Sequence, residues 1–180
     1  MSHFQNPPSN SNANPSANPF GGARILLVDD DVQGLATTRK ILEHAGFVVE
    51  TAEDGQYAID RIRRETVDGR EKLDLVISDV RMPRMTGLEF LGALRHSGKT
   101  IPVVLMTAYG RVEDAVWAMK LGAVDFLTKP FKRAALLDAV ESAMRRAGVR
   151  SAEASANAEG KDAPKPEVRR GSARIAGRSI

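Results

Sequence analysis

Three consecutive aspartates, Asp29 to Asp31, follow the short apolar run ARILLV at residues 23–28. Like charges this close repel one another and raise each other's pKa, so the cluster needs a positive partner. A second apolar run, LDLVIS at residues 73–78, also ends on a carboxylate, Asp79. Because clustered carboxylates are the oxygen ligands that Mg²⁺ takes, the residues predict a magnesium site where these runs end.

Two further apolar runs end on groups that suit phosphate chemistry. IPVVLMTA (101–108) carries Thr107 near its end, and AVDFLT (123–128) is followed by Lys129 and Pro130. A hydroxyl and an ammonium group beside a metal complement the oxygens of a phosphoryl group, whose transfer depends on positioning and charge neutralisation. A carboxylate in such a site can itself be the nucleophile and form an aspartyl phosphate.

Each of these residues also has a purely structural interpretation. An aspartate after a strand is often a helix N-cap, and we expect this of Asp31. Thr107 also suits a turn, and Pro130 suits the first position of a helix. The joint placement of polar groups at four strand ends favours one common site.

The elements that must position these groups alternate regularly. Five apolar runs of strand type lie at 23–28, 47–52, 73–78, 101–108 and 123–128, and helix-type periodicity follows each one, at 32–46, 55–65, 86–98, 111–122 and 133–148. Parallel strands need crossover connections, which helices supply, so the pattern predicts an α/β fold: a doubly wound parallel sheet with helices on both faces. Ligand sites in such sheets lie beyond the carboxyl ends of the strands.

Composition limits the other possibilities. The chain has 180 residues, 42% of them hydrophobic, and no cysteine, which excludes disulfides and thiolate metal sites. No apolar stretch is long enough to span a membrane, and the first residues do not resemble a secretory signal. We expect a cytoplasmic protein that does not enter a membrane.

The chain divides into a central domain, residues 23–147, and two polar ends. Residues 1–22 are rich in Asn, Ser and Pro, and residues 148–180 hold few large apolar side chains, so both are expected to be disordered. Residues 1–147 carry 19 basic and 19 acidic side chains, and residues 148–180 carry 7 and 4. The net charge of +3 therefore lies in the last segment, and direct nucleic-acid binding by this chain is not expected.

Four motifs in order, ILLVDDD, LVISDVRMPRMTGLEFL, VLMTAYG and DFLTKPF, resemble the receiver domain of two-component response regulators over residues 23–147. The resemblance implies a CheY-like, flavodoxin-like sheet of strand order 2-1-3-4-5. It implies that Asp79 accepts a phosphoryl group from a sensor histidine kinase or a phosphotransfer protein, and that the domain is a signalling switch rather than a turnover enzyme.

The same resemblance assigns roles to the other residues. Asp30, Asp79 and the backbone carbonyl of Arg81 would bind Mg²⁺ directly, and Asp29 would act mainly through water. Thr107 and Lys129 would bind the phosphoryl oxygens. Phe126 occupies the aromatic switch position, and its inward turn would alter the surface formed by the last two helices and the last strand.

Three features vary within this family pattern. Phe126 stands where many members have tyrosine, so switching must rest on packing. The long cation of Arg81 either affects hydrolysis of the aspartyl phosphate or points into solvent. The charged stretch RRETVDGREKLD (63–74) makes the segment before the third strand look long, and we interpret it as a surface insertion.

Helix 111–122 carries an aromatic residue on its predicted outer face. Val112, Ala115, Val116 and Met119 share one face, which is expected to pack on the sheet and leave Trp117 outward with Glu113 and Lys120. Trp117 then either contributes to a phosphorylation-dependent homodimer or partner contact, or lies over neighbouring side chains.

The terminal stretch ARIAGRSI (173–180) resembles the entry of the ATPase domain of NtrC-like transcription activators, although no GxxxxGK[ST] loop is present. Regulation of transcription through an effector domain outside this chain is therefore one context, and a stand-alone receiver is the other. A phosphohydrolase with an aspartate nucleophile would carry a second aspartate at position 81, where this chain has arginine. A receiver that works without phosphorylation is disfavoured because every acidic, hydroxyl and lysine position is filled.

Overall fold

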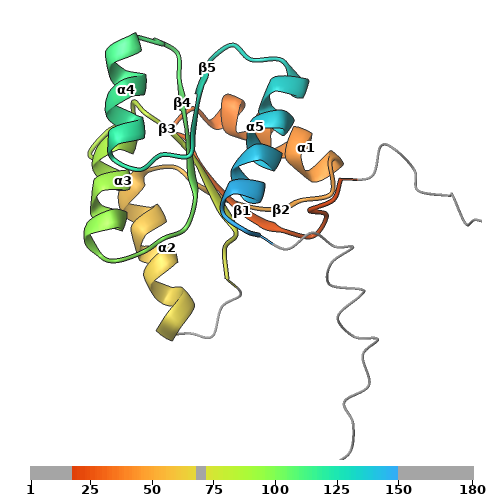
Figure 1. Ribbon diagram of the computed structural model, residues 1–180, viewed down its shortest axis with the longest axis horizontal. Helices are drawn as coiled ribbons and strands as arrows, with labels where there is room; N and C mark the ends of the chain where they lie inside the picture. Colours follow the sequence, from red (N-terminus) through yellow and green to blue (C-terminus); the bar gives the residue numbers. More distant parts are fainter. Residues whose placement is uncertain (1–17, 68–71, 150–180) are drawn as a thin grey trace, which may run out of the picture.

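The protein is described here by a computed structural model covering residues 18–67 and 72–149. Within them five strands alternate with five helices, as predicted (Figure 1). The elements are β1 (Arg24–Val28), α1 (Val32–His44), β2 (Val48–Ala52), α2 (Gly55–Val67), β3 (Leu75–Asp79), α3 (Gly87–His96), β4 (Val103–Thr107), α4 (Val112–Lys120), β5 (Asp125–Thr128) and α5 (Arg133–Arg146).

The strands form one parallel sheet in the order β2-β1-β3-β4-β5, which confirms the predicted flavodoxin-like topology. In the register, Val28 at the end of β1 pairs with Ala52 on one side and Ser78 on the other. Because the strands are parallel and nearly in register, their carboxyl ends meet at one edge of the sheet.

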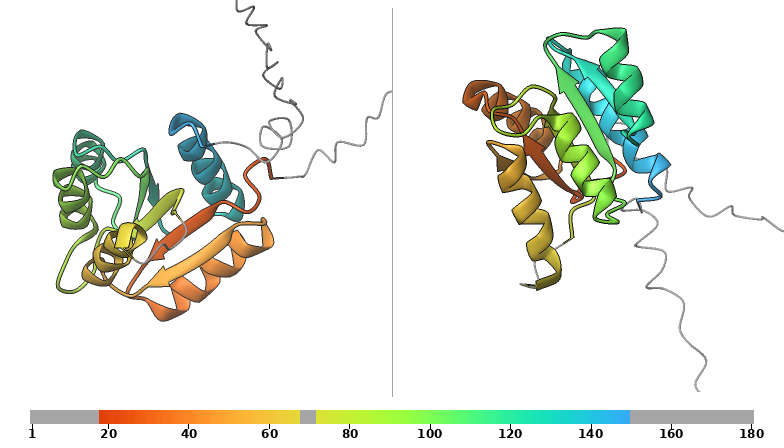
Figure 2. Two further views of the ribbon diagram at one scale, coloured as in Figure 1. Left: turned by 90° about the horizontal axis from the view of Figure 1, so that it is seen from below. Right: turned by 90° about the vertical axis from the view of Figure 1, so that its left-hand side faces the viewer.

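Helices cover both faces of the sheet, as the two perpendicular views show (Figure 2). Strand side chains point alternately to opposite faces, so Ile25 and Leu27 pack with α1 and α5, whereas Leu26 and Val28 pack with α2, α3 and α4. Strands β1, β3 and β4 are buried on both faces, which explains why they read as continuous apolar runs.

Side-chain caps fix the starts of α1 and α3. The Asp31 carboxylate accepts a hydrogen bond from the backbone N–H of Gln33, which confirms its predicted role as the N-cap of α1. Thr86 and Glu89 form a reciprocal capping box at α3. The interpretation of Pro130 as the first residue of a helix is wrong, because α5 begins at Arg133 with Lys132 as its N-cap.

Helix α4 does not bury the face that the spacing of its apolar residues predicted to lie against the sheet. Val112, Val116 and Met119, predicted to pack on the sheet, are 74%, 47% and 47% exposed, and Ala118 is the fully buried residue of the helix. Trp117 does face outward, as predicted, and is 56% exposed. The helix rests on the sheet through a small side chain, so large apolar side chains stay on its outer surface.

The described residues include five, 18–22, that precede the predicted domain boundary at residue 23. Phe20 is only 4% exposed and joins the core cluster that packs against α1 and α5. Backbone and side-chain bonds hold this segment: the Asn18 amide donates to the Ala45 carbonyl at 2.8 Å, and the Gly22 N–H donates to the Gly46 carbonyl at 2.7 Å. The remainder of the two predicted disordered ends, and part of the charged 63–74 stretch, lie outside the described residues.

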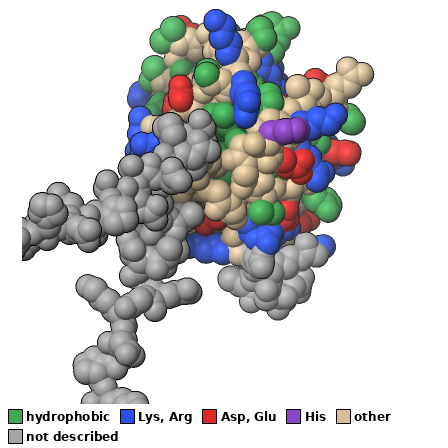
Figure 3. Space-filling model, turned by 90° about the vertical axis from the view of Figure 1, so that its right-hand side faces the viewer, with side chains coloured by type: hydrophobic (Ala, Val, Ile, Leu, Met, Phe, Trp, Pro, Cys, Tyr) green, Lys and Arg blue, Asp and Glu red, His purple; other side chains and the backbone are tan. Residues whose placement is uncertain are grey.

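Over the described ranges, no helix is long and apolar enough to cross a lipid bilayer. The face that carries α1 and α5 shows Lys and Arg side chains interspersed with Asp and Glu (Figure 3). On this face the described residues therefore present mixed charge rather than a continuous basic stripe.

Candidate functional site

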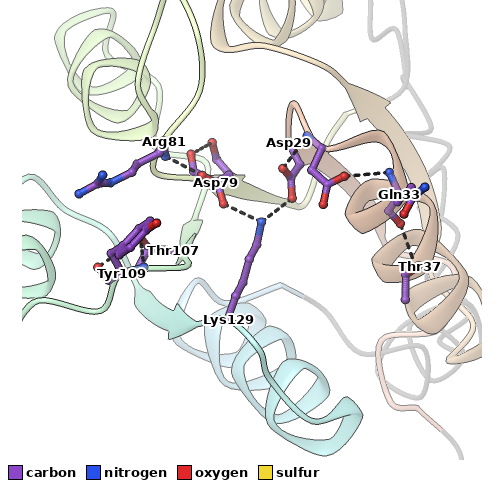
Figure 4. Close-up of polar contacts among 10 residues, drawn as sticks. Asp29, Gln33, Thr37, Asp79, Arg81, Thr107, Tyr109 and Lys129 are labelled. Carbon is purple, nitrogen blue, oxygen red and sulfur yellow. Dashed lines mark hydrogen bonds and ion pairs between the residues drawn. The ribbon is translucent and has the colours of Figure 1, made fainter.

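The polar residues predicted from the strand ends gather at the carboxyl edge of the sheet (Figure 4). Asp29 follows β1, Asp79 ends β3, Thr107 ends β4 and Lys129 follows β5. These strands are neighbours in the sheet, so residues 100 positions apart in the chain come into contact. The fold thus assembles the group from four separate segments.

Lys129 joins the two buried carboxylates. Its Nζ lies 2.6 Å from Asp29 Oδ2 and 2.6 Å from Asp79 Oδ1. Asp29 and Asp79 are 2% and 6% exposed. Buried carboxylates require a counter-charge, and one ammonium group serves both.

Burial raises the pKa of the Asp79 carboxyl above its ordinary value, and the negative charge of Asp29 adds to this. The bonds from Lys129 and from the Arg81 N–H favour the ionised form but do not outweigh burial. For Lys129, burial lowers the pKa, yet the hydrogen bonds and charges of Asp29 and Asp79 outweigh it, and the net pKa is raised. The lysine therefore stays charged between the two acids.

The remaining bonds of the two carboxylates fix their orientation. Asp79 Oδ2 accepts the backbone N–H of Arg81 at 2.6 Å, and Asp29 Oδ1 accepts the backbone N–H of Asp31 at 3.1 Å. Each carboxylate thus has one oxygen on Lys129 and the other on the loop that follows its strand. These bonds fix the orientation of both side chains.

The donor set matches a hard cation in kind: Asp29, Asp30 and Asp79 carboxylates and a backbone carbonyl at Arg81 supply oxygens only. Asp30 is exposed beside the buried pair. Across residues 18–67 and 72–149, however, no three acidic or histidine side chains already converge as a metal cage. Instead, the carboxylates of Asp29 and Asp79 both contact the ammonium group of Lys129. The residues therefore have the ligand chemistry that Mg²⁺ requires, and Lys129 supplies the positive charge beside two of them.

Thr107 is fully buried, and its hydroxyl is engaged with the loop after β4. It accepts the Tyr109 N–H at 3.2 Å and donates to the Tyr109 carbonyl at 3.4 Å. The turn interpretation of Thr107 therefore describes its contacts in this structure, while its position at the site edge agrees with the predicted site.

Arg81 does not simply point into solvent. Its guanidinium carbon lies 4.6 Å from the centre of the Tyr109 ring, a cation–π contact, and the side chain extends away from Asp79 (Figure 4). Sequence reasoning missed Tyr109. The available signal was an aromatic residue two positions after Thr107, in the loop that must border the site.

A second missed contact ties the loop after β3 to the residues that follow β2, two strands away in the sheet. Arg84, at φ 67°, donates to Asp54, an 8% exposed residue whose carboxylate also accepts the Tyr57 N–H at the start of α2. The sequence offers no pattern that predicts this pair, since the two residues lie 30 positions apart.

The two predicted output residues lie away from the carboxylates. Phe126 on β5 is half-buried and packs against the core cluster beneath α3 and α4. Trp117 projects from α4. Neither contacts the Asp29–Lys129–Asp79 group directly among the described interactions.

Comparison with known proteins agrees with this fold. The family model described as the response regulator receiver domain matches residues 25–141. The chain therefore belongs to the response regulator receiver domain family, a family of signalling domains in two-component systems.

Similar proteins include transcriptional and other response regulators. The chain is 38% identical over 123 residues to the transcriptional regulatory protein CpxR of Escherichia coli K12, covering 68% of this chain and 50% of the relative. It is 43% identical over 121 residues to the response regulator protein FleR of Pseudomonas aeruginosa, covering 66% of this chain and 24% of the relative. The chain thus spans about half or less of the length of these relatives.

Solved structures give the same result. The chemotaxis protein CheY4 of Vibrio cholerae superposes with a TM-score of 0.61 at 33% identity, covering 68% of this chain and 99% of that one. A CheY-like receiver domain protein from Methanospirillum hungatei gives 0.63 at 27% identity, covering 71% and 98%. The match therefore spans nearly the whole of these two solved chains and half or less of the longer regulators.

Proposed function

We propose that Asp79 is a phosphoacceptor that takes a phosphoryl group from a histidine kinase or a phosphotransfer protein. The observation that carries the proposal is Lys129, whose ammonium group lies 2.6 Å from both buried carboxylates at the sheet edge. An Asp79 oxygen attacks the phosphorus of a phosphohistidine, the P–N bond breaks, and its electron pair stays on the imidazole nitrogen.

The other residues of the edge then neutralise the transferred charge. Lys129 is held ionised and exchanges part of its contact with Asp79 for the phosphoryl oxygens. Thr107 releases the Tyr109 carbonyl, a long 3.4 Å contact, and donates its hydroxyl to a phosphoryl oxygen. Phe126 fills the space that this movement opens.

Mg²⁺ is the cofactor that the donor set suits. Asp30, Asp79 and the Arg81 carbonyl would hold it directly, and Asp29 through water. When bound, Mg²⁺ neutralises charge on the phosphoryl oxygens during transfer. The protein's own part is to keep three carboxylates at one edge and to join two of them, Asp29 and Asp79, through Lys129.

The surface that changes is proposed to comprise α4, β5 and α5. Val112, Val116, Trp117 and Met119 give α4 an apolar outer face. Such a face suits a homodimer or a partner that binds the phosphorylated form. In the longer context, this contact controls transcription through an effector domain outside the chain. The cysteine-free composition suits action in the cytoplasm.

A stand-alone receiver is the second candidate. It is favoured by the complete overlap with the CheY4 chain, 99% of which is covered. A phosphohydrolase is less well supported. The residue two positions after Asp79 is Arg81, which cannot donate a proton at neutral pH.

Phosphorylation is tested by incubating the protein and its Asp79→Asn variant with Mg²⁺ and a small acyl phosphate. We expect intact-mass spectra to show one added phosphoryl group on the natural chain only. Asp138→Asn, an exposed residue of α5, is the matched control and is expected to behave like the natural chain. An adduct that survives in Asp79→Asn, or no adduct at all, would contradict the proposal.

A further inference from the structure

Two loops at the mouth of the site are joined by one exposed contact. Arg81 belongs to the loop after β3, and Tyr109 to the loop after β4. The guanidinium carbon of Arg81 lies 4.6 Å from the centre of the Tyr109 ring. Both side chains are exposed, so neither is held there by burial in the core.

Each partner is also bonded to a residue of the site through its backbone. The Arg81 N–H donates to Asp79 Oδ2 at 2.6 Å. The Tyr109 N–H and carbonyl engage the Thr107 hydroxyl at 3.2 and 3.4 Å. A chain of contacts therefore runs from Asp79 through Arg81 and the Tyr109 ring to the hydroxyl of Thr107.

This contact is easily exchanged for a stronger one. An exposed cation–π contact is weak, whereas a guanidinium binds a phosphoryl group through two charge-assisted hydrogen bonds. A phosphoryl group on Asp79 would form beside the backbone of Arg81, and Arg81 has a long, flexible side chain rooted at that point.

We propose that Arg81 exchanges partners on phosphorylation: its guanidinium leaves the Tyr109 ring and binds the phosphoryl group on Asp79. Loss of the ring contact frees the loop after β4, whose Tyr109 backbone holds the Thr107 hydroxyl. Arg81 is thus a phosphoryl ligand that is withheld until the group is present. The inference rests on the proposed phosphoacceptor function of Asp79.

The exchange predicts opposite effects for the two side chains. Tyr109→Leu removes the competing partner of Arg81, so we expect beryllofluoride with Mg²⁺ to bind about two- to fivefold more tightly. Arg81→Ala removes the ligand but keeps the backbone carbonyl, so we expect roughly tenfold weaker binding. Isothermal titration calorimetry measures both affinities.

Matched controls come from the same chain. Tyr57→Leu removes a ring that is 61% exposed, against 62% for Tyr109. Arg111→Ala removes an exposed arginine from the loop that carries Tyr109. Both control variants are expected to bind beryllofluoride like the natural chain.

Nuclear magnetic resonance provides a readout that does not depend on affinity. We expect the Arg81 side-chain protons to show a ring-current shift in the free protein, and this shift to disappear in Tyr109→Leu and on addition of beryllofluoride to the natural chain. A shift that persists in the beryllofluoride complex would overturn the exchange.

The affinities separate this inference from the function on which it rests. If the natural chain does not bind beryllofluoride in an Asp79-dependent way, the phosphoacceptor proposal fails. If it binds, but Tyr109→Leu and Arg81→Ala change affinity in the same direction or match the controls, the partner exchange alone is wrong.

Discussion

Lys129 stabilises two buried carboxylates that would otherwise repel each other. Two carboxylates, 2% and 6% exposed, point at one another across the ends of β1 and β3, and the lysine ammonium lies between them. Removal of one partner from a buried charged group costs more than the net value of the contact, because the remaining charges stay buried. The strand ends are therefore stabilised by a residue that the proposed reaction also uses.

Lys129→Met is expected to lower the free energy of unfolding by about 2–4 kcal/mol at neutral pH, since Asp29 and Asp79 lose their common counter-charge. Urea denaturation followed by circular dichroism measures the change. Lys120→Met, at the exposed end of α4, is the control and is expected to change stability by less than about 0.5 kcal/mol. Equal effects of the two variants would show that Lys129 is not needed to offset the buried charges.

The raised pKa of Asp79 gives a pH dependence of defined sign. Between the ordinary carboxyl pKa and the raised value, the folded protein binds this proton more strongly than the unfolded chain. Stability therefore falls as the pH rises through that window, and the cost of the ionised form remains above it. We expect Asp79→Asn to be more stable than the natural chain at neutral pH, with the difference shrinking as the pH is lowered through the window.

Unfolding free energies of the natural chain and Asp79→Asn, measured by urea titration at a series of pH values, check this dependence. Acidic residues remote from Asp79 titrate in the same way in both proteins and cancel in the difference. A difference that is constant with pH, or that grows in acid, would contradict the assigned pKa direction.

At the scale of elements, the turn from β3 into α3 controls the position of Asp79. Gly87 is the first residue of α3, and a Cβ built on it would lie 2.2 Å from the Asp79 carbonyl oxygen. Backbone atoms cannot move aside as a flexible side chain can. The helix therefore approaches the strand end this closely only because residue 87 has no side chain.

Gly87→Ala is expected to lower the free energy of unfolding by about 1–3 kcal/mol and to slow phosphorylation, because the Asp79 backbone must shift. Gly92→Ala, inside the same helix with open space around it, is expected instead to raise stability by about 0.5–1 kcal/mol. Thermal unfolding and the rate of phosphoryl uptake measure the two effects. Similar behaviour of both variants would rule out the close contact at Gly87.

Helix α4 presents its large apolar residues to solvent, with Trp117 56% exposed. Trp117→Ala is expected to weaken self-association of the beryllofluoride-activated protein and to change folding stability by less than about 0.5 kcal/mol. Sedimentation velocity over a concentration series measures the association. Tyr57→Ala, which removes a similarly exposed ring from α2, is the control. If activated Trp117→Ala associates like the natural chain, or if neither protein associates, Trp117 does not form a dimer contact.

For the molecule as a whole, the fold could be predicted from the sequence because its strands are short, apolar and separated by periodic helices. The central strands β1, β3 and β4 are covered on both faces, so nearly all of their residues are apolar. Such runs can be identified as buried strands from the sequence alone. Parallel topology then brings the strand ends together, which is why Asp29, Asp79 and Lys129 were predicted to meet.

The features that were not predicted depend on packing between distant segments. The apolar residues of α4 exceed what its small contact area can cover, so periodicity indicated a buried face where only Ala118 is buried. The contact between Arg81 and Tyr109 joins two loops whose relative position no local pattern sets. Phe20 was overlooked because the Asn, Ser and Pro around it dominate the composition of that segment.

Phe20→Ala is expected to lower the free energy of unfolding by about 2–4 kcal/mol, since the ring fills the core beside α1 and α5. Chemical denaturation measures this effect, with Tyr57→Ala as the exposed-ring control. A loss as small as that of the control would mean that residues 18–22 add nothing to the stability of the domain.

The hydrogen bonds of residues 18–22 also fix where the chain enters the domain, and hence where a label or tether can be attached. The Gly22 N–H meets Gly46 just before β2, and Val149, after α5, borders a hollow with Leu73 and Pro102 at the start of β3 and β4. Both ends of the described domain therefore lie near the starts of the strands, at the edge of the sheet opposite the carboxyl end of β3 where Asp79 lies. A fluorophore, bead or surface linked at either end of the described domain would leave the edge that carries Asp79 open, so single-molecule or biosensor work can tether the domain there without covering the proposed phosphorylation site.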